Sequence, residues 1–229
     1  MTGLRGRGTR VRKRKSLWLQ RVGKVQLSRN GPVEAPLYIV RHCKTRWNLE
    51  GRIQGLTDVP LCEEGRQEAR ENLAKLRSLG LRWVACSPLS RGKETAELYA
   101  KGLGIGLVVC DDLREIDLGE WEGKRSQDLL EDSASPYARW LEDPSQFPLP
   151  PGSTEPVWQA QERIVRAVAK LWEQGPQGPF LIVLHKYVRA LLHCALLGLP
   201  LRSFSSWIIE TTEPYAVSQE ELDRLCQAR

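Results

Sequence analysis

The sequence predicts an α/β fold with a mostly parallel central sheet. Short apolar runs rich in β-branched and aromatic residues alternate with longer segments of helical periodicity between residues 37 and 197. Strands that alternate with helices form βαβ units, whose sheets are largely parallel. Residues of catalytic type follow three of the predicted strands, and ligands of such sheets bind beyond the carboxyl ends of the strands.

The first half of the predicted domain contains three strands and two helices. We expect strands at 37–40, 83–86 and 107–110, and helices over 61–79 and 90–103. Glu63, Glu64 and Glu68 lie in the first turns of the first helix, where they suit the positive end of its dipole. Gly80 ends that helix, and Pro88 with Ser90 marks the beginning of the next.

The second half begins with a segment that is rich in Pro, Ser and Asp. Residues 124–157 are therefore expected to be irregular or to hold only short helices. Beyond them we expect a helix over 158–174, a strand at 180–184 and a buried helix over 188–197. Near the C-terminus, residues 207–209 are a candidate closing strand and residues 219–227 have a helical pattern.

Composition places the chain among ordinary globular proteins. Of its 229 residues, 41% are hydrophobic and 27% are charged, which allows a sizeable core and argues against a largely disordered chain. No stretch approaches the roughly 20 apolar residues that a membrane span needs. We therefore expect one folded domain and no membrane partner.

Basic residues are concentrated near the N-terminus. Residues 1–30 hold ten Lys or Arg and no acid, which leaves 24 basic against 28 acidic residues in 31–229. Nucleic-acid binding by the domain is therefore not expected. We expect residues 1–34 to form a basic, disordered tail and residues 35–229 to form the domain. A weak contact of the tail with RNA or an anionic surface, and a transit-peptide role, stay open as alternatives.

The cysteines and histidines bear on localisation and metal binding. None of the six cysteines forms a C-x-x-C pair, and a chain of 229 residues does not need disulfides to fold. We interpret them as reduced thiols of a cytoplasmic protein. None of the three histidines lies at ligand spacing from a cysteine or a carboxylate, so we expect no metal site.

Two histidines and two arginines near predicted strand ends suit phosphate chemistry. Arg41 and Arg91 offer guanidinium groups that bind phosphate oxygens bidentately, and a protonated His185 would add positive charge. His42 directly follows Arg41. A neutral imidazole is a good nucleophile near neutral pH, so His42 is placed to accept a phosphoryl group and release it in a second step.

Ester cleavage also needs an acid for the departing oxygen. Glu115 and Asp117 lie in the polar segment after the third predicted strand, and each is a candidate for this proton donor. A single histidine after a strand is more often structural than catalytic. Two such histidines with matching arginines favour catalysis, so we expect these residues to meet at one anion-binding pocket.

Four segments, in the correct order, resemble the histidine phosphatase superfamily, which includes the cofactor-dependent phosphoglycerate mutases. Residues 41–48 resemble its R-H-G-x-T-x-x-N signature, and residues 87–96 are similar to its second phosphate-binding segment. Residues 113–123 resemble the acid-bearing loop and residues 185–192 the second-histidine segment. The resemblance covers about residues 36–200 and implies a three-layer α/β/α fold of the phosphoglycerate mutase type.

The resemblance also implies a role for each matching position. His42 would be the phosphorylated nucleophile and Glu115 the general acid and base. The transferring phosphoryl group would be held by Arg41, Asn48, Arg91 and His185. The hydrolytic chemistry of the family needs no metal or organic cofactor.

The spacing of the two histidines resembles the short phosphatase branch of the family. His42 and His185 are 143 positions apart, whereas the mutases carry a longer segment between their histidines. We therefore expect hydrolysis of a small phosphorylated metabolite. Two alternatives are a mutase-type isomerase and a weakened relative that only binds a phosphorylated ligand.

Several positions depart from the family pattern, and two of them favour the weakened relative. Cys43 stands where the family has glycine after the nucleophile, and Tyr187 stands where small residues follow the second histidine. A tyrosine ring between the two histidines would exclude the phosphate. The position of the Tyr187 ring therefore distinguishes a catalytic pocket from a pocket that the ring blocks.

Overall fold

The computed structural model describes residues 35–227, apart from residues 134 and 148–149. These residues belong to one unit, Glu34–Arg229. The predicted basic tail over residues 1–34 lies outside the described residues, so its predicted disorder stays a prediction.

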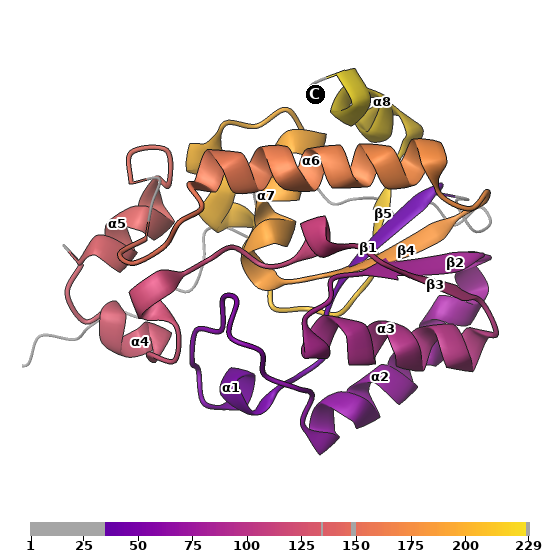
Figure 1. Cartoon of the computed structure of the whole chain (residues 1–229), viewed down its shortest axis with the longest axis horizontal. Helices are drawn as coiled ribbons and strands as arrows, with labels where there is room; N and C mark the ends of the chain where they lie inside the picture. The colour runs from indigo at the N-terminus through magenta and orange to yellow at the C-terminus, as the bar shows by residue number, and fades with distance from the viewer. Residues whose placement is uncertain (1–34, 134, 148–149, 228–229) are drawn as a thin grey trace, which may run out of the picture. The chain divides into compact units, whose positions relative to one another are not determined.

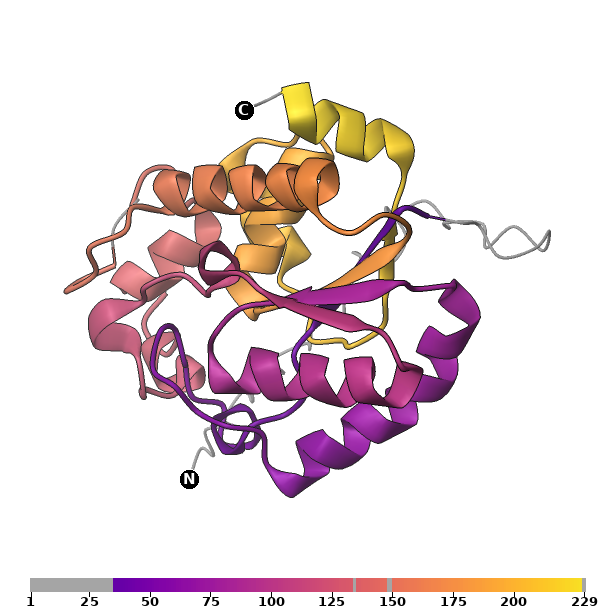
Figure 2. The same ribbon diagram turned by 45° about the vertical axis from the view of Figure 1, so that its right-hand side comes forward.

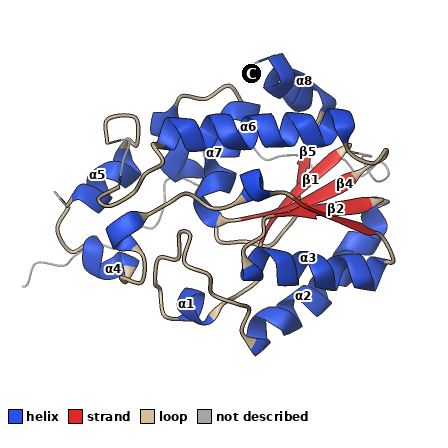
Figure 3. Ribbon diagram, viewed as in Figure 1, coloured by secondary structure: helices blue, strands red, loops and turns tan. Residues whose placement is uncertain are grey.

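A five-stranded sheet forms the centre of this unit, in the order β3-β2-β4-β1-β5 (Figure 1, Figure 3). The parallel strands are β1 (Leu37–Arg41), β2 (Trp83–Cys86), β3 (Gly106–Val109) and β4 (Phe180–Leu184). Strand β5 (Tyr215–Val217) pairs antiparallel with β1. The predicted mostly parallel sheet is thus confirmed, and the four predicted strands are correct to within one residue.

Helices cover both faces of the sheet (Figure 1, Figure 2). On one face lie α2 (Glu63–Leu76) and α3 (Ser90–Leu103), and on the other lie α6 (Val157–Gln174), α7 (Lys186–Leu196) and α8 (Gln219–Gln227). This arrangement confirms the predicted three-layer α/β/α architecture. The helical pattern of 219–227 is confirmed as α8.

The strands supply both hydrophobic cores because successive side chains point to opposite faces of the sheet. Ile39 and Ile182 pack in the core on the side of α6 and α7. Their neighbours Val40 and Val183 pack in the core on the side of α2 and α3. The continuous apolar runs in the sequence therefore reflect strands that are buried on both faces.

Short helices occupy several of the connections between the longer elements. These are α1 (Arg46–Leu49), α4 (Ser126–Leu129), α5 (Pro136–Glu142) and the 3₁₀ helices η1 (Arg77–Leu79), η2 (Asp111–Leu113), η3 (Gly119–Trp121) and η4 (Leu201–Trp207). The predicted irregular segment 124–157 contains α4 and α5, as expected. Among the described residues, no helix is both long enough and apolar enough to cross a membrane.

The predicted closing strand at 207–209 is wrong. Helix η4 ends at Trp207, residues 208–214 form no regular element, and the closing strand is β5. The indole ring of Trp207 stacks on His193, with ring centres 4.8 Å apart. Trp207 therefore packs against α7 and does not pair in a strand.

Candidate active site

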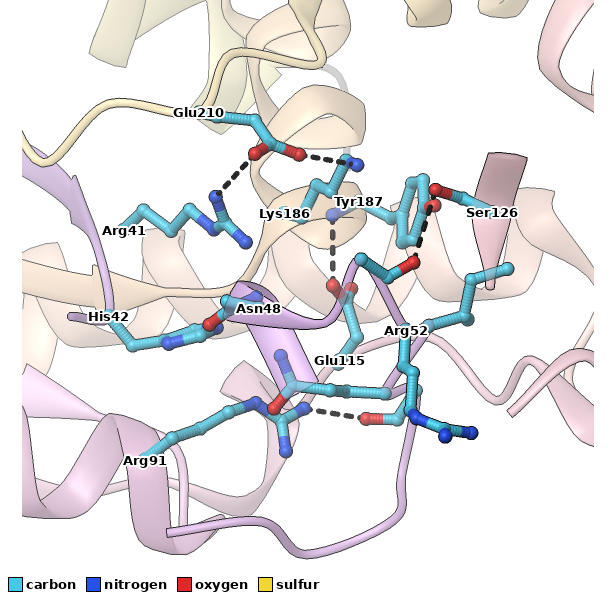
Figure 4. Close-up of a pocket in the computed structure, with 14 residues that line it drawn as sticks. Arg41, His42, Asn48, Arg52, Arg91, Glu115, Ser126, Lys186, Tyr187 and Glu210 are labelled. Carbon is cyan, nitrogen blue, oxygen red and sulfur yellow. Dashed lines mark hydrogen bonds and ion pairs between the residues drawn. The ribbon is translucent and has the colours of Figure 1, made fainter. Parts of the chain in front are cut away.

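The strand ends that carry the predicted site residues meet at one cavity of about 200 Å³ (Figure 4). Five of the six predicted residues line it, namely Arg41, His42, Asn48, Arg91 and Glu115. The sixth, His185, is fully buried beside it, and its ring centre lies 5.2 Å from that of His42. Folding thus gathers residues from four separate segments of the sequence.

The His42 ring is held in one tautomer at the end of β1. Its Nδ1 lies 2.7 Å from the carbonyl oxygen of Cys43. A carbonyl only accepts hydrogen bonds, so Nδ1 carries the proton and Nε2 keeps its lone pair. Burial, together with the charges of Arg41 and Arg91, lowers the pKa of His42 well below its ordinary value. The geometry and the charges therefore both favour a neutral, nucleophilic imidazole.

Arg91 is fixed at the base of the cavity by backbone carbonyls. Its Nη1 donates to the Thr57 carbonyl at 2.9 Å, and its Nη2 donates to the Gly55 carbonyl at 2.6 Å. Burial lowers the pKa of Arg91 to about 10, which still leaves the guanidinium protonated at neutral pH. Held in this way, its planar group suits bidentate contact with phosphate oxygens.

His185 orients Arg91 and is itself neutral. Its Nδ1 accepts from Arg91 Nε at 3.2 Å, so the ring proton resides on Nε2, which lies 2.6 Å from Ser87 Oγ. Burial and the nearby charge of Arg91 lower the pKa of His185 well below its ordinary value. The expected protonated His185 is therefore not what this geometry favours, because its immediate neighbour is already a cation.

Glu115 is a buried carboxyl group at the N-terminus of α7. It accepts N–H groups of Ile116 at 3.0 Å, Tyr187 at 2.9 Å and Val188 at 2.8 Å. Burial nevertheless raises its pKa above the ordinary value, because it outweighs these bonds and the charge of Arg91. Glu115 thus has the environment of a carboxyl group that can hold a proton to donate.

The rival candidate Asp117 has a structural position. Its Oδ1 accepts the Gly119 N–H at 3.0 Å, and its Oδ2 accepts the Thr154 N–H at 2.8 Å. Its side chain therefore ties two loops together and does not line the cavity. Of the two carboxyl groups that the sequence left open, the geometry favours Glu115.

Asn48 offers its amide nitrogen to the cavity. Its Oδ1 accepts the Thr45 N–H at 3.0 Å in the capping box that begins α1. Because a backbone N–H can only donate, this contact fixes which end of the amide is oxygen. The Nδ2 group is therefore the one that Asn48 can direct to an anion.

Sequence reasoning missed Glu122, which holds the loop beneath Arg91. Its carboxylate accepts the backbone N–H groups of Leu56 at 2.8 Å and Thr57 at 2.9 Å, and the Thr57 hydroxyl. Gly55 has φ +53°, and a Cβ there would lie 2.0 Å from Glu122 Oε1. A side chain at Gly55 would therefore displace the carboxylate. The only signal in the sequence was that Glu122 lies within the acid-bearing segment.

Sequence reasoning also missed Glu210, from the loop before β5. Its carboxylate lies 2.7 Å from Lys186 Nζ and 3.8 Å from Arg41 Nη1 (Figure 4). Burial opposes its ionisation, but the Lys186 hydrogen bond and the two nearby cations lower its pKa. Arg52 and Ser126 complete this outer rim of the cavity. No motif of the sequence marks Glu210, because it reaches the site only through the fold.

The two departures from the family pattern are accommodated without blocking the cavity. The Tyr187 hydroxyl bonds with that of Tyr137 at 2.7 Å, and its ring packs edge-on against Trp140. The ring therefore does not fill the space between the two histidines. Cys43 is fully buried, its N–H donates to Thr95 Oγ1 at 3.1 Å, and burial raises its thiol pKa to about 11. Cys43 is thus a packing residue of low reactivity.

Comparison with known proteins identifies the family. A sequence profile of the histidine phosphatase superfamily (branch 1) matches residues 37–226. The chain belongs to the histidine phosphatase superfamily. A protein named probable phosphoglycerate mutase GpmB, from Salmonella paratyphi B, is 38% identical over 165 residues, which are 72% of this chain and 75% of that protein.

Solved structures of histidine phosphatase relatives share the fold. A mycobacterial glucosyl-3-phosphoglycerate phosphatase in complex with VO3 is 27% identical, with a TM-score of 0.68 over 78% of this chain and 88% of that chain. The α-ribazole phosphatase of Shigella flexneri is 27% identical, with a TM-score of 0.67 over 80% of this chain and 91% of that chain. These neighbours support a phosphatase.

Proposed function

We propose that the protein hydrolyses phosphate monoesters of small metabolites through a phosphohistidine intermediate at His42. One observation carries this proposal. A histidine whose pKa is lowered and a carboxylic acid whose pKa is raised line the same cavity as two guanidinium groups. A nucleophile, a proton donor and an anion-binding pair are the parts that phosphoryl transfer requires.

In the first step, Nε2 of His42 attacks phosphorus and the bond from phosphorus to the ester oxygen breaks. The proton of Glu115 goes to the departing oxygen, which leaves as a neutral alcohol. Arg41 and Arg91 stabilise the negative charge on the three phosphoryl oxygens while the group is in transfer. His185 holds Arg91 in place during this step and is a positioning residue.

In the second step, water attacks the phosphorus of the phosphohistidine. The Glu115 carboxylate takes a proton from this water, and the bond from phosphorus to Nε2 of His42 breaks. Inorganic phosphate leaves, and both side chains return to their starting protonation states. The same carboxyl group thus acts as acid in one step and as base in the next.

Hydrolysis is favoured by the phosphatase neighbours and by the short spacing between the histidines. A relative that was solved with VO3 shows that an oxyanion of three oxygens binds within this family. The second candidate, isomerisation, is favoured by the relatives named probable phosphoglycerate mutases. An isomerase would return the phosphoryl group to its substrate in place of passing it to water.

The test is turnover of p-nitrophenyl phosphate and of a panel of metabolite monoesters by wild-type protein and His42→Ala, with a chelator present. We expect phosphate release by the wild type and none above background by His42→Ala. Arg46→Gln is a matched control, because Arg46 is exposed and does not line the cavity. Equal rates for the wild type and His42→Ala would contradict the proposal.

Isomerisation is tested separately with 3-phosphoglycerate and a bisphosphoglycerate primer. The proposed function predicts release of inorganic phosphate without formation of 2-phosphoglycerate. Formation of 2-phosphoglycerate faster than phosphate release would establish the isomerase in its place.

A further inference from the structure

Two exposed arginines lie opposite each other in the chain beside the active-site cavity, which Arg52 lines and Arg125 does not. Arg52 and Arg125 form an isolated antiparallel bridge, which is secured beside them by the Ser126 N–H donating to the Gly51 carbonyl at 2.9 Å. Residues directly opposite in such a bridge point to the same face and lie close together. Like charges in this arrangement destabilise a protein. The pair therefore places two exposed positive charges side by side.

The repulsion between the two guanidinium groups is not offset by an ion pair between Arg125 and a carboxylate of the described residues. Arg52 Nε contacts Glu50 at 2.8 Å, and its Nη1 donates to the Gly123 carbonyl at 2.7 Å. Among the described side chains, none forms an ion pair with Arg125. One guanidinium is thus fixed in position, while its partner across the bridge lacks a counter-ion.

Arg52 also lines two cavities. It lines the active-site cavity together with His42 and Glu115. It lines a second cavity of about 460 Å³ as well, in which Lys124 and Arg125 are the other cations and Asp128 is the acid. The catalytic cavity therefore shares Arg52 with a neighbouring cavity that is lined mainly by cations.

The position of Arg52 relates the second cavity to the leaving group of a bound ester. Figure 4 shows His42 and Arg52 at opposite sides of the cavity with Glu115 between them. The ester oxygen must meet Glu115 to receive its proton, and it departs from the side of phosphorus opposite His42. The alcohol part of a bound ester therefore extends toward Arg52.

We propose that Arg52 and Arg125 together bind a second anionic group, a carboxylate or a phosphate, on the alcohol part of the substrate. This inference rests on the proposed function, because that function sets the direction of the leaving group. An anion between the two guanidinium groups gains charge-assisted hydrogen bonds and removes their mutual repulsion. The preferred substrates are then phosphate esters of acidic alcohols, and esters of neutral alcohols are poorer.

The test compares three esters that share one three-carbon scaffold. Glycerol 3-phosphate has no second anion, 3-phosphoglycerate adds a carboxylate, and glycerol 1,3-bisphosphate adds a phosphate. Both kcat/KM and calorimetric affinity are measured for wild type, Arg125→Gln and Arg46→Gln. The last variant removes an equally charged, exposed side chain that lines neither cavity.

We expect the wild type to prefer at least one of the two doubly anionic esters. Arg125→Gln should reduce that preference about tenfold, mainly through KM, as for the loss of a hydrogen bond to a charged group. Arg46→Gln should leave the preference unchanged. The ester that loses most in Arg125→Gln distinguishes a carboxylate subsite from a phosphate subsite.

Two results would overturn the subsite. One is a wild type that shows no preference in turnover or in affinity, and the other is an equal change in Arg125→Gln and Arg46→Gln. Failure of the proposed function has another signature. No ester, including p-nitrophenyl phosphate, would then be hydrolysed, while an affinity preference that depends on Arg125 would still support the subsite.

Discussion

At the scale of single residues, the cavity sets two protonation states in opposite directions. Burial lowers the pKa of His42 because the protonated ring loses its hydration, and the charges of Arg41 and Arg91 lower it further. Burial raises the pKa of Glu115 because its ionised form is the charged one. One environment thus favours a neutral nucleophile and a protonated acid, which are the two forms that the first step consumes.

Replacement of Glu115 should depend on the leaving group. Glu115→Gln removes the proton donor, so we expect kcat/KM for alkyl phosphates to fall about 10²- to 10⁴-fold. p-Nitrophenolate leaves without a proton, so the loss measured with p-nitrophenyl phosphate should be much smaller. Steady-state kinetics with both substrates check this, and equal losses with the two would exclude Glu115 as the acid.

The pH profile supplies a control for this variant. His42 acts when neutral, so activity rises as pH increases through its lowered pKa. Glu115 donates when protonated, so activity toward alkyl phosphates falls as pH increases through its raised pKa. The Glu115→Gln variant should lose the alkaline fall and keep the acidic rise.

Tyr187 should contribute to stability more than to catalysis. Tyr187→Phe leaves the buried Tyr137 hydroxyl without its 2.7 Å partner, which should cost about 1–3 kcal/mol of unfolding free energy. Urea denaturation measures this cost, and the double variant with Tyr137→Phe should recover part of it. A large loss of kcat at unchanged stability would instead indicate that the Tyr187 hydroxyl acts in catalysis.

Residues that follow strands or lie in the four family-like segments were predictable from sequence, and residues that reach the site from other loops were not. Arg41, His42 and His185 follow buried strands whose apolar runs are visible in the sequence. Glu210 lies in a loop without periodicity, and Arg52 contributes through a bridge to a distant segment. Such contacts arise from chain folding and leave no local pattern.

At the scale of elements, the loop that supports Arg91 depends on one carboxylate. Glu122 accepts the N–H groups of Leu56 and Thr57, and this fixes the carbonyls that hold the Arg91 guanidinium. Catalysis by positioning is lost when a group shifts by about 1 Å. The support of Arg91 is therefore part of the catalytic geometry even though Glu122 does not line the cavity.

Glu122→Ala should impair turnover while the fold is retained. We expect kcat/KM to fall about 10- to 100-fold, because the released loop no longer fixes Arg91. Glu120→Ala is the matched control, since Glu120 is an exposed residue of η3, the 3₁₀ helix that Glu122 directly follows. Similar kinetics for the two variants, with circular dichroism confirming that both fold, would show that the loop needs no such support.

The one strand that sequence reasoning misplaced differs from the others in kind. Strand β5 has three residues and is antiparallel, and only its last residue is fully buried. Its apolar run is only three residues long, which is too short to predict a strand, so its pairing with β1 depends on tertiary contacts. The parallel strands β1, β2 and β4 are buried on both faces and so were visible.

At the scale of the whole molecule, one buried arginine joins the helical layer to the catalytic loop. Arg163 of α6 contacts Glu155 through Nε at 2.6 Å and through Nη2 at 2.8 Å. Its Nη1 donates to the carbonyls of Asp112 at 2.6 Å and Arg114 at 3.0 Å. The chain that leads into Glu115 is therefore fastened to α6.

Loss of this connection should destabilise the fold. Arg163→Leu removes the two-pronged partner of Glu155, which keeps only Arg114 at 3.2 Å, so we expect a loss of about 1–3 kcal/mol in unfolding free energy. Arg166→Leu, on the exposed side of the same helix, should change it by only about 0.5 kcal/mol or less. Chemical denaturation compares the two, and equal stabilities would mean that Arg163 has no such role.

The proposed function requires a phosphoryl group on His42 during turnover, so direct detection of that group is the decisive measurement. Wild-type protein is mixed with a phosphate ester, quenched within milliseconds and analysed by mass spectrometry of its peptides. We expect one phosphoryl group, labile in acid and stable in base, on the peptide that contains His42, and none in His42→Ala. Rapid turnover with no such adduct, or an adduct on another residue, would contradict the proposed function.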